Sequence, residues 1–161
     1  MTAENDNQSF KDIFKKLNYG VYILGSVYKG SHDLMTCTWA MQGSFENGEL
    51  IVNIGKERPI YSLVSQSGYF SLSILGVANM KEASVCAKSS EQRETALDTI
   101  QFETTEDGLP YLQTSLAYLI CEVIDTVELE TAFLVVGKPI GGKILSEGET
   151  LTLHEYYKRL I

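Results

Sequence analysis

The chain has 161 residues, of which 44% are hydrophobic and 21% are charged, and its formal net charge is −8. This length and composition are typical of one globular domain with a sizeable core. The acidic charge argues against nucleic acid as a partner, because phosphate binding requires a positive field. No apolar run is long enough to cross a bilayer, and the polar, acidic start lacks the features of a signal peptide. We therefore expect a cytoplasmic protein with no membrane partner.

The elements predicted along the chain are mostly short strands. Residues 1–9 are expected to be flexible, and residues 8–17 form a short helix with one apolar stripe, with Ser9 as its N-cap. A hairpin turn rich in turn-forming residues is predicted at residues 29–33, and another turn at Asn47-Gly48. Helical segments are predicted over residues 60–68, 80–86 and part of 89–105. Strands are predicted over residues 19–27, 34–42, 50–54, 69–75, 116–129 and 132–145, with a bulge or kink at Gly141-Gly142.

These elements define the expected fold class. Many short strands without regular alternation of strands and helices favour an antiparallel barrel over a parallel sheet. No repeat, linker or low-complexity tract divides the chain. We therefore expect residues 10–161 to form a single, mainly β domain with peripheral helices. The chain has no Gly-x-Gly-x-x-Gly loop, so a nucleotide would have to be held by strand edges and turns.

Residues 33–42 are the first candidate binding segment. They place two threonines and the only tryptophan on one predicted strand. Since side chains alternate along a strand, Thr36 and Thr38 share one face, opposite Cys37 and Trp39. A threonine hydroxyl offers one donor and two acceptor lone pairs. Such a strand can bind a flat ligand with polar edges, although a half-buried strand with solvated threonines has the same pattern.

The second candidate segment is an apolar strand that ends in a turn with two cations. Residues 50–59 contain Lys56 and Arg58 just after a glycine, residues 60–68 follow as a short helix, and residues 69–75 form the next strand. A local cation is what an anionic ligand would need on a chain this acidic. The order of these elements resembles the flavin reductase-like family, whose fold is the FMN-binding split barrel, an antiparallel split β-barrel.

Further segments extend the resemblance over roughly residues 10–157. Residues 18–26 look like the first barrel strand of the family, residues 106–112 like its Gly-x-Pro-x-Leu turn, and residues 116–123 like the strand that follows. The resemblance implies a homodimer with flavin at the subunit interface. A barrel of this length fills its interior with side chains, so a flavin would have to lie in a groove outside it.

The resemblance also implies a cofactor, flavin mononucleotide (FMN), and an electron donor, NAD(P)H; the electron acceptor is left open. The threonine strand would line the flavin, the turn after residue 53 would hold the phosphate and ribityl chain, and Tyr156 or Tyr157 matches a late aromatic residue of the family. No catalytic residue is assigned. The predicted cofactor-binding residues are Asp33, Met35, Thr36, Cys37, Thr38, Trp39, Asn53, Gly55, Lys56, Arg58 and Tyr156.

The chain departs from the family pattern in several places. Asp33 stands where the family often has asparagine, which would bring a negative charge near an anionic cofactor. Glu91 and Thr95 replace an arginine and a lysine, and Arg93 is the nearby cation that could substitute. No histidine precedes the last long strand. These differences leave open a second function: a non-catalytic flavin- or small-ligand-binding dimer, or an electron-transfer module.

Other chemistries have weaker support in the sequence. The three cysteines are widely spaced, which favours reduced structural thiols over a metal site. The two histidines and the lack of a Gly-x-Ser-x-Gly turn argue against a nucleophilic triad. Glu128 and Glu130 are expected to share a strand face and to be solvated. We therefore predict no metal site.

Overall fold

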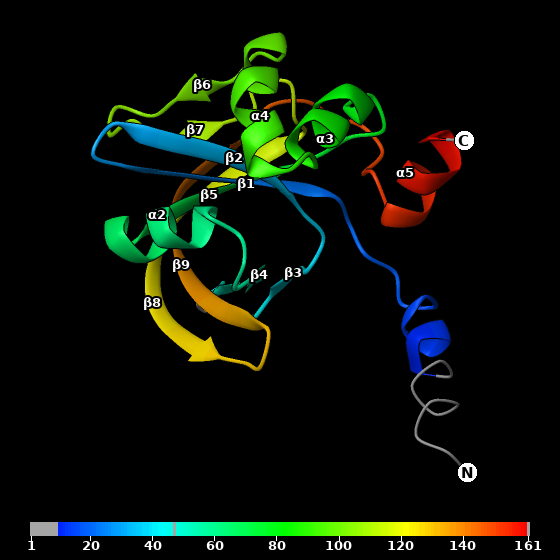
Figure 1. Ribbon diagram of the computed structural model, residues 1–161, viewed down its shortest axis with the longest axis horizontal. Helices are drawn as coiled ribbons and strands as arrows, with labels where there is room; N and C mark the ends of the chain where they lie inside the picture. Colours follow the sequence, from blue (N-terminus) through cyan, green and yellow to red (C-terminus); the bar gives the residue numbers. More distant parts are fainter. Residues whose placement is uncertain (1–9, 47, 161) are drawn as a thin grey trace.

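The computed structural model describes residues 10–46 and 48–160. Its main feature is a seven-stranded antiparallel sheet in the order β2-β1-β5-β8-β9-β4-β3 (Figure 1). The edge strands β2 and β3 are consecutive in the chain but are not hydrogen-bonded neighbours, so the curled sheet is split between them. The predicted fold class is confirmed. The strands are β1 (Tyr22–Tyr28), β2 (Ser31–Cys37), β3 (Ala40–Gln42), β4 (Leu50–Gly55), β5 (Tyr69–Ile74), β8 (Ala117–Glu128) and β9 (Ala132–Ile144), with a separate pair formed by β6 (Glu103–Thr104) and β7 (Pro110–Tyr111).

The helices lie around the sheet. They are α2 (Ile60–Ser67), α3 (Met80–Cys86), α4 (Ser90–Ala96) with a 3₁₀ turn (Leu97–Thr99), and α5 (Leu153–Leu160). An N-terminal helical segment, residues 10–14, stands away from the sheet (Figure 1). In the part of the chain that the structure describes, no helix is long and apolar enough to cross a membrane.

Helix α2 confirms the prediction for residues 60–68. It follows Pro59, whose fixed φ suits a helix start. It buries Ile60 and Val64 against the sheet and ends at Gly68, whose φ of 75° few other residues adopt. The Gly68 N–H donates to the Val64 carbonyl, so the helix terminus is capped just where β5 begins.

The long hairpin of β8 and β9 contains the predicted irregularity. Ile120 pairs with Gly141 and Cys121 with Pro139, so the register shifts by one residue next to the two glycines. A Cβ on Gly142 would lie 2.5 Å from the Tyr118 carbonyl oxygen. The close backbone approach at the bulge therefore requires a glycine.

Some boundaries differ from those predicted. The strand expected over residues 34–42 is broken at Thr38 and Trp39, because β2 pairs with β1 whereas β3 pairs with β4. The first strand begins at Tyr22, since Val21 instead donates its N–H to the Leu151 carbonyl. Glu130 lies in the turn beyond β8 and shares no strand face with Glu128.

The N-terminal helix predicted over residues 8–17 is helical only up to residue 14 in the described part. Its apolar stripe is present but exposed: Phe10, Ile13, Phe14 and Leu17 each keep more than half of their surface in water. Residues 1–9, including Ser9, and Asn47 lie outside the described residues, so the predictions made for them are not addressed by the structure.

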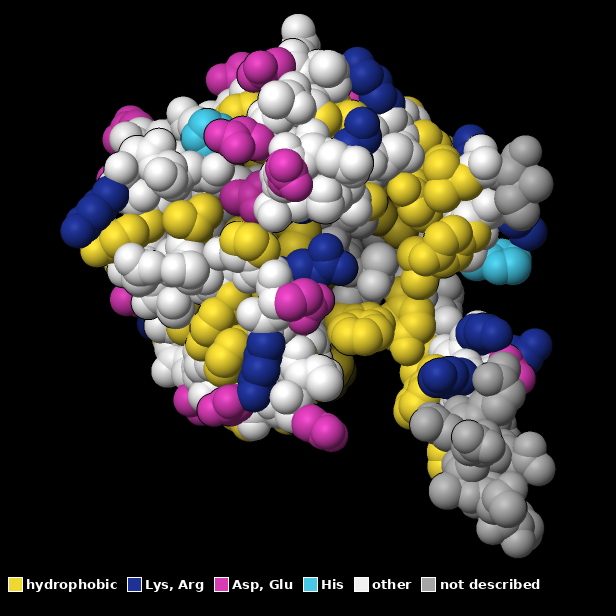
Figure 2. All heavy atoms as spheres, viewed as in Figure 1, with side chains coloured by type: hydrophobic (Ala, Val, Ile, Leu, Met, Phe, Trp, Pro, Cys, Tyr) yellow, Lys and Arg dark blue, Asp and Glu magenta, His cyan; other side chains and the backbone are white. Residues whose placement is uncertain are grey.

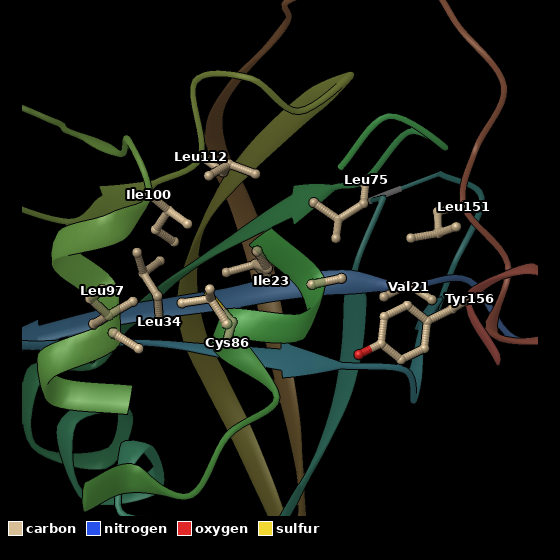
Figure 3. Close-up of a cluster of buried hydrophobic side chains, with 13 residues drawn as sticks. Val21, Ile23, Leu34, Leu75, Cys86, Leu97, Ile100, Leu112, Leu151 and Tyr156 are labelled. Atoms are coloured by element: carbon tan, nitrogen blue, oxygen red, sulfur yellow. The ribbon is translucent and has the colours of Figure 1, made fainter. Parts of the chain in front are cut away.

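The core has two clusters of buried side chains. One fills the curl of the sheet and is closed by α2; its members include Leu24, Met35, Cys37, Val52, Ile54, Ile60, Val64 and Phe70. The other lies between the sheet and helices α3 to α5 and includes Val21, Ile23, Leu34, Leu75, Cys86, Leu112, Leu151 and Tyr156 (Figure 3). Each large apolar side chain buried in this way stabilises the fold by roughly 1.5–3 kcal/mol. The second cluster anchors α3 and α5 beside the split in the sheet.

Candidate functional site

A cavity of about 360 Å³ opens at the split, where the chain leaves β2. Its walls come from the end of β2, the turn after β4, the end of α3, and α5. Most of the predicted cofactor-binding residues are brought together here. The lining residues are Val21, Met35, Thr36, Cys37, Thr38, Trp39, Asn53, Gly55, Glu57, Arg58, Cys86, Ala87, Leu153, Tyr156 and Tyr157.

The threonine segment forms one wall of the cavity. Residues from both faces of the predicted strand line it: Met35, Thr36 and Cys37 at the end of β2, and Thr38 and Trp39 in the break that follows. Thr36 donates its hydroxyl proton to the Ala83 carbonyl at 2.7 Å, so it faces a ligand as an acceptor only. Burial raises the pKa of the Cys37 thiol to about 11, which keeps it protonated near neutral pH. Trp39 is 57% exposed and is the largest aromatic surface in this wall.

Strand β4 supplies the amide of the cavity, and the turn that follows it supplies the cation. The Oδ1 atom of Asn53 is buried and has no hydrogen-bond partner within the described residues. An orphaned acceptor beside a cavity indicates a missing donor. The Arg58 side chain is about half exposed, and its Nε lies 3.2 Å from Glu57 Oε1. The arginine is thus available to an anion, with one carboxylate competing for it.

Two predicted cofactor-binding residues are not brought to the cavity. The first is Lys56, whose ammonium pairs with Glu128 Oε1 at 2.5 Å and lies 5.5 Å from the centre of the Phe133 ring. That ring stacks on Tyr61 with centroids 3.8 Å apart. Lys56 therefore links the end of β8 to the turn that follows β4. It lines none of the cavity.

The second is Asp33. Its carboxylate accepts hydrogen bonds from Arg93 Nε at 2.8 Å and from Arg93 Nη2 at 2.5 Å. The negative charge expected near the cofactor is neutralised by this arginine. The sequence suggests Arg93 only as a substitute for a missing family cation; the structure gives it a carboxylate partner instead.

Helix α5 closes the cavity on its remaining side. Tyr156 is buried, and its hydroxyl lies 3.3 Å from Ser84 Oγ of α3. Tyr157 is 59% exposed at the rim. Sequence reasoning missed Val21, Glu57, Cys86, Ala87 and Leu153 as lining residues. For Cys86 and Ala87 a signal was available, because they lie a few residues before Glu91, Arg93 and Thr95, where the chain departs from the family pattern.

A second, apolar hollow of about 660 Å³ adjoins the cavity and shares Thr38, Trp39 and Asn53 with it. Figure 2 shows hydrophobic surface gathered here, between the body of the molecule and the N-terminal segment. The other lining residues are Phe14, Leu17, Asn18, Tyr19, Ala40, Met41, Ile51 and Leu134. The rim of the cavity is therefore continuous with a larger apolar surface.

The family model described as "Flavin reductase like domain" matches residues 14–160, nearly the whole chain. The chain belongs to this family. No cluster of three or more His, Cys, Asp or Glu side chains in the described ranges could hold a metal ion in this flavin reductase-like chain.

Three matches illustrate the range of its relatives. The ferric-chelate reductase (NAD(P)H) of Archaeoglobus fulgidus is 26% identical over 150 residues, covering 91% of this chain and 88% of the relative. Diflavin flavoprotein A 1 of Synechocystis is 28% identical over 144 residues, covering 86% of this chain but only 25% of that longer protein. The solved structure of the flavin reductase PheA2 superposes with a TM-score of 0.79 at 26% identity, covering 91% of this chain and 92% of that one.

Proposed function

We propose that this chain binds FMN in the cavity at the split and transfers electrons from NAD(P)H through it. The observation that carries the proposal is the convergence of Thr36, Asn53, Arg58 and an exposed Trp39 on one cavity. The relative named ferric-chelate reductase (NAD(P)H), aligned over most of both chains, supports a nicotinamide as the donor.

The residues present fit a flavin. The isoalloxazine ring and ribityl chain carry N–H and O–H donors, which would satisfy the orphaned Asn53 Oδ1 and the Thr36 hydroxyl oxygen. Trp39 offers an apolar surface for the ring. When bound, the flavin supplies the hydride-accepting chemistry, and the protein positions it and tunes its surroundings. Met35 and Cys37, both buried, add apolar side chains to the cavity wall.

The charge of the cavity favours FMN over larger flavins in this proposal. Arg58 is the only Lys or Arg among the described residues that line it. One guanidinium suits one terminal phosphate, held by charge-assisted hydrogen bonds. Lys56, the other predicted phosphate ligand, would have to leave Glu128 to take part.

We further propose that the working unit is a homodimer. The apolar hollow beside the cavity is lined by exposed side chains, among them Met41 at 62% and Phe14 at 60%. Contiguous apolar surface of this kind marks an interaction site. A second copy related by a twofold axis would cover both hollows at once and complete the rim of each cavity.

The three buried free thiols suit the reducing cytoplasm.

The small number of unpaired cations near the cavity supports a second function. Both Lys56 and Arg93 are engaged by carboxylates, and Glu91 and Thr95 stand where the family often has cations. A site with few free cations could bind flavin without productive nicotinamide binding. The alternative is a flavin-binding or electron-transfer dimer without turnover.

The experiment that separates these functions uses the full chain. Titration with FMN, FAD and riboflavin, followed by flavin fluorescence, gives the order of affinities. Anaerobic addition of NADH or NADPH to the loaded protein then reports reduction as loss of the yellow colour. Bleaching supports the reductase, an unreduced bound flavin supports the alternative, and no saturable binding of any flavin contradicts both.

A further inference from the structure

Arg93 is the largest fully buried side chain in the described part of the molecule, with 1% of its surface exposed. Its donors are directed to two partners. Nε and Nη2 bind the two carboxylate oxygens of Asp33, and Nη1 donates to the Lys88 carbonyl at 2.7 Å. This is a two-pronged arginine–carboxylate pair with an additional backbone contact, a geometry that fixes orientation as well as distance.

The pair joins two walls of the cavity. Asp33 lies on β2, three residues before Thr36, while Lys88 directly follows the lining residues Cys86 and Ala87. A second bond ties the same two walls together, because Thr36 donates to the Ala83 carbonyl of α3. The chain is thus linked to β2 on both sides of Cys86: directly at the Ala83 carbonyl of α3, and through Arg93 of α4 at the Lys88 carbonyl beyond α3.

Neither partner is itself part of the cavity surface. An ion pair in this position contributes little net stability, since desolvation offsets the attraction, but either charge left alone is strongly unfavourable. Its effect is therefore mainly geometric. Where the family often has asparagine, this chain has an aspartate together with a matching arginine, and the two act as one unit.

We infer that Asp33 and Arg93 are a positioning pair, which sets the Cys86–Ala87 wall of the cavity against β2 and so determines how tightly the flavin is held. The inference rests on the proposed function for the identity of the ligand. The accessibility of the Cys86–Ala87 wall, however, can be measured without any flavin.

Two variants separate positioning from simple loss of stability. Arg93→Lys keeps the positive charge but loses the two-pronged guanidinium geometry. The double variant Asp33→Leu with Arg93→Met removes both charges, and such apolar replacements of buried pairs are often neutral or stabilising. Leu109→Ala is the matched control, because Leu109 is buried, belongs to neither core cluster and does not line the cavity, so its truncation should lower the melting temperature without touching the pair.

The first readout is the dissociation constant for FMN, and the second is the rate at which iodoacetamide labels Cys86 in the flavin-free protein, resolved by peptide mass spectrometry. Cys121, in the other core cluster, is the internal reference. We expect both pair variants to weaken FMN by about tenfold, by analogy with the smallest losses seen when the supporting contacts of metal ligands are removed. Labelling of Cys86 should accelerate relative to labelling of Cys121. Leu109→Ala should change neither the FMN dissociation constant nor this ratio of labelling rates.

Unchanged labelling and unchanged FMN affinity in both variants would overturn the inference, as would equal effects of Leu109→Ala at the same loss of melting temperature. Failure of the proposed function has a different signature. In that case the wild-type protein binds no flavin, and the labelling ratio alone still supports or refutes the fixed wall.

Discussion

The main-chain N–H of Asn53 donates to the carbonyl of Trp39 at 2.9 Å, and this bond fixes the point where the chain leaves β2 and enters β3. Both residues line the cavity and also the apolar hollow. The proposed cofactor site and the proposed subunit interface are therefore built on the same pair of residues, and a change at one should be felt at the other.

Tryptophan fluorescence should report flavin binding directly. Trp39 is the only tryptophan of the chain and lies at the cavity, so a bound flavin would quench its emission. We expect the quenching to saturate together with the change in flavin fluorescence. In Trp39→Phe the tryptophan signal is lost, whereas flavin fluorescence still follows binding. Saturable flavin binding that leaves Trp39 emission unaltered would place the flavin elsewhere.

Arg58 and Lys56 should differ in their effect on the phosphate. Arg58 lines the cavity, whereas Lys56 is held by Glu128. A charge-assisted hydrogen bond is worth roughly 1.5–3 kcal/mol, so Arg58→Ala should weaken FMN about tenfold to a hundredfold. Riboflavin, which lacks the phosphate, should be affected much less, and Lys56→Ala should have a smaller effect on both ligands.

The comparison is made by titrating each variant with both ligands. Equal weakening of FMN and riboflavin in Arg58→Ala would mean that the arginine acts on the fold. A larger phosphate effect for Lys56→Ala than for Arg58→Ala would mean that Lys56 exchanges Glu128 for the ligand.

Much of the fold was predictable because local signals agree with it. The helix at residues 60–68 has its proline start and its glycine end in the sequence, and the long hairpin shows its bulge as two adjacent glycines. The break at Thr38 and Trp39 was not predictable, since both residues favour strands. Only the switch of pairing partner, which is a tertiary effect, interrupts the strand there.

The candidate site was predictable to a similar extent. A resemblance in element order placed the threonine segment and the turn after β4 together, and the structure brings nine of the eleven named residues to the cavity. Lys56 and Arg58 could not be told apart, because the direction of a side chain in a turn depends on contacts such as Glu128. The partner of Asp33 was also hidden, since it lies 60 residues away in the chain.

The buried thiols should make stability fall at alkaline pH. Burial raises the pKa of Cys86 and of Cys121 to about 12, above the ordinary value of 9.0. Unfolded thiols ionise first, so their stabilising contribution is fully present below about pH 9 and is lost as pH rises towards 12. The slope is about 1.4 kcal/mol per pH unit for each thiol.

Urea unfolding of the wild type and of Cys121→Ala at several pH values between about 8 and 11 measures this contribution. The difference in unfolding free energy between the two proteins should shrink by about that slope above pH 9. If the unfolding free energies of the two proteins differ by the same amount at every pH, Cys121 ionises equally in the folded and unfolded states.

The apolar hollow should be needed for both assembly and cofactor binding. Met41→Lys places a charge in this hollow, and Met41 does not line the cavity. We expect a dimer to dissociate and FMN affinity to fall with it, as followed by sedimentation with flavin absorbance recorded alongside protein. Ile144→Lys is the control, since Ile144 is 71% exposed on β9 and lines neither the cavity nor the apolar hollow. A wild-type monomer that carries a full complement of flavin would refute the shared site.

Anaerobic reduction of the FMN-loaded protein tests the central claim most directly. NADH or NADPH is added in small steps while the absorbance of the bound flavin is recorded, with Arg58→Ala run at equal flavin occupancy to keep binding separate from electron transfer. The proposed function predicts stoichiometric bleaching of the bound flavin by at least one of the two nucleotides. A flavin that is fully bound at the cavity and stays oxidised with both nucleotides would contradict it.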